Sequence, residues 1–133
     1  GHAYHATLPT DALVQLRDAI LEAEAVGFSA LEEAQWLLGQ RARAALERSG
    51  FPSVSAPGFQ APGVIVSHTT DPQIKSGQKF AAAGLQIAGG VPLRCGEHAD
   101  FSSFRIGLFG LDKLSHVDRT VGHLEAALAS LGG

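Results

Sequence analysis

An arginine in the middle of an alternating segment has the clearest capacity for chemistry in this sequence. Large apolar side chains at Phe104, Ile106 and Leu108 alternate with small or polar ones, the period-2 pattern of a half-buried strand. The pattern predicts that Arg105 lies on the opposite face of that strand. A guanidinium fixed there presents a planar set of donors suited to a carboxylate. On the residue pattern alone, an arginine on the solvent-exposed face of a sheet is the more common interpretation.

The other polar groups have a weaker case for a function. Cys95 is the single cysteine and has no base marked beside it, so we interpret it as an ordinary thiol. His116 and His123 are seven residues apart, but a metal site needs a third converging ligand, and we expect none. The polar residues at 97–100 precede the arginine segment, where a solvent-exposed loop is favoured over a loop at the mouth of an active site.

Three segments resemble, in the same order, segments of the class V pyridoxal-phosphate aminotransferases, the alanine–glyoxylate and serine–pyruvate group. Residues 104–110, Phe-Arg-Ile-Gly-Leu-Phe-Gly, resemble the arginine strand near the end of those enzymes. Residues 4–7, Tyr-His-Ala-Thr, resemble their tyrosine-histidine-x-threonine segment, and residues 84–90 resemble the strand and glycines ahead of the arginine. The resemblance runs from about Tyr4 to about Leu131 and covers the C-terminal third or so of such an enzyme.

The resemblance implies roles for three residues. Arg105 matches the arginine that binds the α-carboxylate of the amino-acid or 2-oxo-acid substrate. Tyr4 and Thr7 match residues that reach the cofactor phosphate of the neighbouring subunit in a homodimer. Pyridoxal phosphate also requires a Schiff-base lysine and an acidic partner for its ring nitrogen, which we expect in an N-terminal domain outside this sequence. Lys79 has a superficially similar context, but it follows Tyr4, whereas the family's lysine precedes that segment.

Composition limits the classes of partner. A chain of 133 residues that is 45% hydrophobic is expected to form one globular unit. Charged residues make up only 17%, which suggests that part of the surface normally faces another domain or subunit. A net charge of −3 without a basic run argues against nucleic acid and anionic membranes as partners. With one cysteine and neither a leader nor a membrane-spanning run, a cytoplasmic location is expected.

Two helices are expected at the start of the chain. Thr10 is the predicted N-cap of the first, which ends at Gly27. Ser29 and Glu32 form a predicted capping box for the second, which ends at Gly50. The charged residues along the second helix, Arg41, Arg43, Glu47 and Arg48, are interpreted as a solvated face.

Alternating strands and helices are expected from residue 50 onward. Residues 64–66 predict a buried strand, and Asp71 followed by proline predicts the start of a helix that closes at Gly84. Residues 85–88 predict another strand, followed by a turn at the two glycines 89 and 90. Apolar residues at spacings of four and three predict an amphipathic helix over 117–131.

These elements predict an α+β fold, a small and mainly antiparallel sheet with helices packed on one face, preceded by a long connecting helix. The resemblance assigns residues 1–27 to an extended segment and an interdomain connecting helix. It assigns residues 28–133 to the small C-terminal domain, with the large cofactor-binding domain missing. Because the sequence also lacks methionine, we expect a fragment of a larger enzyme.

The expected function is therefore that of the parent enzyme. A pyridoxal-phosphate aminotransferase would move an amino group between an amino acid and a 2-oxo acid, such as alanine or serine and glyoxylate or pyruvate. This fragment would supply the substrate-carboxylate arginine and be inactive by itself. Two alternatives stay open: a stand-alone α+β module that binds a small molecule, and a class V relative with other chemistry, such as a lyase or a phosphonate aminotransferase.

Overall fold

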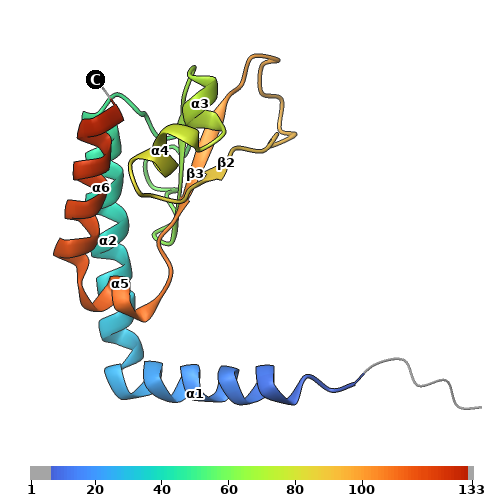
Figure 1. Ribbon diagram of the computed structural model, residues 1–133, viewed down its shortest axis with the longest axis vertical. Helices are drawn as coiled ribbons and strands as arrows, with labels where there is room; N and C mark the ends of the chain where they lie inside the picture. Colours follow the sequence, from blue (N-terminus) through green and yellow to red (C-terminus); the bar gives the residue numbers. More distant parts are fainter. Residues whose placement is uncertain (1–6, 132–133) are drawn as a thin grey trace, which may run out of the picture.

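The computed structural model describes residues 7–131, which form an α+β fold (Figure 1). Its strands are β1 (Val64–His68), β2 (Ala88–Gly89) and β3 (Ser103–Gly107). Its helices are α1 (Thr10–Val26), α2 (Phe28–Arg48), α3 (Pro72–Lys75), α4 (Gln78–Ala82), α5 (Leu111–Ser115) and α6 (Val117–Leu131). The predicted fold class is confirmed, including the long helix at the start.

The three strands form one antiparallel sheet in the order β1-β3-β2. The arginine-bearing strand β3 is thus the central one and is hydrogen-bonded on both sides. Arg105 lies opposite Val66 of β1 and opposite Ala88 of β2. Because directly opposed residues share a face of the sheet, these three side chains project away from the face that carries Phe104.

The core lies between the sheet and the helices. Phe104 is completely buried and Ile106 is 9% exposed. The ring of Phe104 lies edge-on to that of Phe51, with centroids 5.4 Å apart, and 5.3 Å from that of Phe80 on α4. Such aromatic pairs add specific geometry to the burial of apolar surface. The alternation in the sequence therefore places the apolar half of β3 where we expected it.

Helices α2 and α6 lie side by side and close the core (Figure 1). Leu38 and Leu46 of α2 and Leu124 of α6 are among the buried residues between them. At their exposed margins Arg48 pairs with Glu125 at 2.8 Å, and Arg41 pairs with Asp118. The helix predicted over residues 117–131 from its apolar spacing is confirmed, since α6 spans those residues.

Helix α1 departs from the rest of the molecule (Figure 1). None of its residues is buried, and its exposed side chains include Leu13, Leu16 and Ile20. Gly27, with a φ of 98°, is the only residue between α1 and α2. The hydrogen-bond ladders of both helices reach it, because its N–H donates to Ala23 and its carbonyl accepts from Leu31.

Both predicted caps of the first two helices are wrong. Helix α1 begins at Thr10 itself, and α2 begins at Phe28 directly after Gly27, with no side-chain cap at either start. Ser29 and Glu32 therefore lie inside α2, because the helix continues to the joint at Gly27. In contrast, Asp71 caps α3 as predicted. Its carboxylate accepts hydrogen bonds from the backbone N–H groups of Gln73 and Ile74.

Three further predictions need correction. The predicted helix after Asp71 is divided into α3 and α4 at Gly77, which adopts a φ of 81°. Arg43 is not on a solvated face: it is 6% exposed and donates to the Ser53 hydroxyl and the Ala61 carbonyl, so it secures the loop ahead of β1. Residues 85–87 are not strand, and the short α5 was not predicted.

Candidate functional site

Arg105 occupies the middle of the central strand and is half-buried. Its Nε donates a hydrogen bond to the carbonyl oxygen of Gly89 at 3.0 Å. No carboxylate in the described part of the chain forms an ion pair with it. The guanidinium is therefore oriented by backbone, while its two terminal nitrogens keep their four N–H donors for another partner.

The orientation of Arg105 follows from the burial of its neighbours. Phe104 and Ile106 fill the core on one face, so β3 cannot rotate about its own axis without exposing both. Pairing with β1 and β2 fixes the register of the strand on each side. An arginine whose direction is determined in this way loses little further freedom when it pairs with a planar anion.

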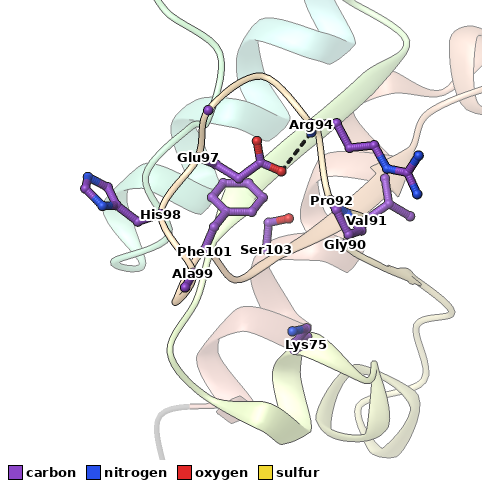
Figure 2. Close-up of a pocket in the computed structure, with 11 residues that line it drawn as sticks. Lys75, Gly90, Val91, Pro92, Arg94, Glu97, His98, Ala99, Phe101 and Ser103 are labelled. Carbon is purple, nitrogen blue, oxygen red and sulfur yellow. Dashed lines mark hydrogen bonds between the residues drawn. The ribbon is translucent and has the colours of Figure 1, made fainter.

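A cavity of about 440 Å³ opens beside the same strand, between the end of β2 and the loop of residues 91–101 (Figure 2). Ser103, two residues before Arg105, is part of its lining, together with Gly90, Lys75 and Phe101. Arg105 itself is not among the lining residues. The cavity adjoins the arginine along β3, since residues i and i+2 of a strand project on the same face.

The loop over this cavity is held by Glu97. Its carboxylate accepts hydrogen bonds from the backbone N–H groups of Arg94 and Cys95, both at 2.8 Å. These bonds lower the pKa of Glu97 to about 2, and the bond from Arg94 has the largest effect. The sequence favoured a solvent-exposed loop here, and residues 98–100 are exposed, while Glu97 and His98 also line the cavity. Their proximity to the arginine strand was the only available signal.

Ser103 is the least accommodated polar residue of the site. It is 2% exposed, and its hydroxyl has no hydrogen-bond partner. Figure 2 shows this hydroxyl between the Phe101 ring and the backbone of Gly90. The predicted turn at the two glycines does not form: Gly90 continues the pairing beyond β2 by donating its N–H to the Ser103 carbonyl at 2.9 Å. Sequence inspection identified the glycines but not this close pairing.

Of the two residues with implied cofactor roles, only Thr7 is among the described residues. Tyr4 lies outside the described residues. Thr7 is exposed and precedes α1, a helix that lies well away from β3 in Figure 1. Their assignment therefore remains a prediction, one that refers to a cofactor in a neighbouring subunit rather than to this chain's own strand.

The lysines also bear on a cofactor. Lys79 pairs with Asp71 at 2.7 Å, and Lys113 donates to the Phe109 carbonyl at 2.8 Å. Lys75 lines the cavity described above. Two of the three lysines are thus engaged with this chain's own groups. Within residues 7–131, no group of three or more His, Cys, Asp or Glu residues is placed to hold a metal ion.

Comparisons with known proteins support the fold. No protein-family model matches the chain, and no curated protein matches it. Among solved structures, the chain is similar to the crystal structure of an alanine–glyoxylate aminotransferase from Nostoc sp., with a TM-score of 0.69 and 19% sequence identity. The match covers 95% of this chain and 33% of that one, so the chain spans about a third of the length of that enzyme. The likeness shows that this chain has the fold of part of an aminotransferase.

The described helices were also considered as membrane spans. Over the described residues, no helix combines the length and the apolar character needed to cross a bilayer.

Proposed function

We propose that this chain is the C-terminal part of a pyridoxal-phosphate-dependent aminotransferase that moves an amino group between an amino acid and a 2-oxo acid. The observation that carries the proposal is Arg105, half-buried, oriented through Nε by the Gly89 carbonyl, and free of any carboxylate of the described chain. The fold likeness to an alanine–glyoxylate aminotransferase supports it. In this proposal residues 1–27 connect two domains and residues 28–133 form the smaller one.

Arg105 would contribute binding and orientation. Two parallel N–H···O bonds from a guanidinium to the α-carboxylate fix both the position and the plane of the substrate. An orientation fixed in this way lowers the barrier of the subsequent proton removal at Cα, because less freedom remains to be lost. The pyridoxal group supplies the electron sink in such enzymes, and the resemblance implies that its lysine would lie in an N-terminal domain.

The surface of the chain supports the existence of a further domain. A folded monomer of 13.8 kDa exposes about 6,600 Å², whereas this chain exposes 8885 Å². The difference, about 2,300 Å², exceeds the roughly 800 Å² that each partner contributes to a standard protein–protein interface. Much of the exposed apolar surface lies on α1.

In the proposed homodimer, Tyr4 and Thr7 ahead of α1 would reach the cofactor phosphate of the neighbouring subunit with neutral hydroxyl donors.

The proposal is tested on the intact protein that contains this chain. We expect a yellow protein whose amino donors and 2-oxo-acid acceptors are identified by an activity screen, and a colourless, inactive 133-residue chain. Combined Tyr4→Phe and Thr7→Ala substitutions should weaken cofactor retention. An intact protein without pyridoxal phosphate, in which no donor–acceptor pair reacts, would contradict the proposal.

A stand-alone binding module is the second candidate, because Arg105 and the adjacent cavity are both formed without any other domain. This candidate predicts that the 133-residue chain binds a small carboxylate such as pyruvate by itself. Isothermal titration of the chain with pyruvate distinguishes the two: saturable binding that is lost in Arg105→Ala favours the module. The absence of binding, with activity in the intact protein, favours the aminotransferase.

A further inference from the structure

The contact between β2 and β3 at Gly90 has a geometry that only glycine permits. Gly90 donates its N–H to the Ser103 carbonyl at 2.9 Å, which brings the two backbones together just beyond β2. A Cβ at position 90 would lie 2.1 Å from the Ser103 hydroxyl oxygen, 2.3 Å from its carbonyl oxygen and 2.6 Å from its carbonyl carbon. Both residues line the cavity shown in Figure 2.

The requirement at Gly90 is for space and not for an unusual backbone angle. Its φ is outside the left-handed range, unlike that of Gly77 or Gly84. Two of the three clashing atoms belong to the backbone of the central strand, which is paired on both sides and cannot yield cheaply. Any side chain at position 90 must therefore push β2 away from β3.

Displacing β2 would act on Arg105. The adjacent residue, Gly89, supplies the carbonyl that accepts the hydrogen bond of Arg105 Nε at 3.0 Å. Gly89 is itself confined, because a Cβ there would lie 3.2 Å from the Lys75 carbonyl oxygen. The position of this carbonyl is thus set by a glycine pair enclosed between β3 on one side and the end of α3 on the other.

We propose that Gly90 is a positioning residue for Arg105: the close approach it allows holds the Gly89 carbonyl on Nε and so sets the direction of the guanidinium. The inference rests on the proposed function, in which that guanidinium binds the substrate carboxylate. It also specifies the geometry of binding. Because Nε is already engaged, the carboxylate pairs end-on with the two terminal nitrogens, and the side-on geometry that uses Nε is closed.

The first experiment measures the hydrogen bond itself in the 133-residue chain by nitrogen-15 NMR. In the unmodified chain the Arg105 Nε–H should exchange slowly with solvent. Gly90→Ala should accelerate that exchange by at least about tenfold, because the carbonyl acceptor moves away. The control is Gly122→Ala on α6, where a new Cβ meets nothing within 4 Å, and it should leave the signal unchanged.

The second experiment uses the intact enzyme and a 2-oxo acid as substrate. Gly90→Ala should raise KM on the order of tenfold, with a smaller change in kcat, because ground-state placement of the carboxylate is lost. A merely structural defect would reduce the amount of active enzyme and leave KM as it was. Adding Ser103→Gly to Gly90→Ala should not restore KM, since the clashes with the Ser103 backbone remain.

The outcomes separate the two proposals. A raised KM in Arg105→Ala with a normal KM and a normal Nε signal in Gly90→Ala would overturn the positioning role alone. A normal KM in Arg105→Ala would overturn the proposed function, while the NMR result would still decide the positioning. If Gly90→Ala does not fold, Gly89→Ala, whose clash is milder, should show the same change in Nε exchange to a smaller degree; an unchanged signal there would overturn the inference.

Discussion

Arg105 and its partner Gly89 show how a single side chain can be prepared for a ligand without an acidic neighbour. The backbone carbonyl engages one nitrogen of the guanidinium and adds no compensating negative charge. A carboxylate neighbour would have held the group as firmly but would have competed with the ligand. The positive charge therefore stays available for an incoming anion.

Substitution of Arg105 tests this at the residue scale. In the intact enzyme, Arg105→Ala should raise KM for the acid substrate about 10- to 100-fold, because the charged hydrogen bonds between the guanidinium and the substrate carboxylate are lost. Arg105→Lys should retain most of that rise, because an ammonium cannot reproduce the planar arrangement of donors. Steady-state kinetics measure both. Arg119→Ala is the control, since its exposed pair with Asp112 should contribute little; unchanged KM in both Arg105 variants would remove the assignment.

Glu97 gives a prediction about pH. Its pKa is lowered from 4.5 to about 2 by the hydrogen bonds from Arg94 and Cys95, so the ionised form favours the folded loop. This contribution is fully present above about pH 4.5 and is lost as the pH falls through about 2. The protection of the Arg94 and Cys95 amides from exchange, measured relative to the intrinsic rate at each pH, should therefore decrease over that interval. In Glu97→Gln this decrease should be absent; a pH dependence of protection identical to that of the unmodified chain would contradict the role given to Glu97.

At the scale of the elements, helix packing depends on close approach as much as on apolar surface. Gly39 of α2 lies against the segment that leads into β1, where a Cβ would be 2.5 Å from the Pro62 carbonyl oxygen. Gln35 donates to the same carbonyl at 3.1 Å. This contact sets how near α2 comes to the sheet.

Matched glycine substitutions test that contact. Gly39→Ala should lower the free energy of unfolding by about 1–3 kcal/mol, the usual cost of overpacking. Gly122→Ala, in open space on α6, should be neutral or raise it by about 0.5–1 kcal/mol, because alanine favours the helix. Urea denaturation followed by circular dichroism measures both. Equal effects of the two substitutions would show that α2 can shift to accept the methyl group.

The elements that could be predicted from sequence are those specified by their own periodicity or local chemistry. The alternation around Arg105, the apolar spacing of α6 and the Asp71 cap are of this kind, and all three are found. The capping box at Ser29 failed because α2 continues back to Gly27. The burial of Arg43 and the close contact of Gly90 with Ser103 depend on segments distant in sequence, so no local pattern could have shown them.

At the scale of the whole molecule, the described chain divides into a packed part and a helix without a partner. The sheet, α2 and α6 enclose the core, whereas α1 buries none of its residues. An exposed helix with large apolar side chains on more than one side is typical of an element that is covered in a larger assembly. This division agrees with the proposed connection of two domains.

Substitutions in α1 test that division. Leu16→Glu and Ile20→Glu together should change the unfolding free energy of the 133-residue chain by no more than about 0.5 kcal/mol, because both side chains are exposed. The same pair should lower the melting temperature of the intact protein. Leu124→Ala, in the core of α6, should instead destabilise the chain by about 2–5 kcal/mol. A large loss of stability in the chain from the α1 pair would show that α1 is already packed.

The joint between α1 and α2 has a consequence for motion. Because a single glycine separates the two helices, no flexible linker lies between them that could absorb a displacement of α1 relative to α2. In the proposed enzyme, a domain attached ahead of α1 would move together with this helix, and the rotation would be concentrated in the two dihedral angles at Gly27. A change of a few degrees there would be multiplied along the seventeen residues of α1, so opening and closing over the arginine strand could be controlled from a single position in the chain.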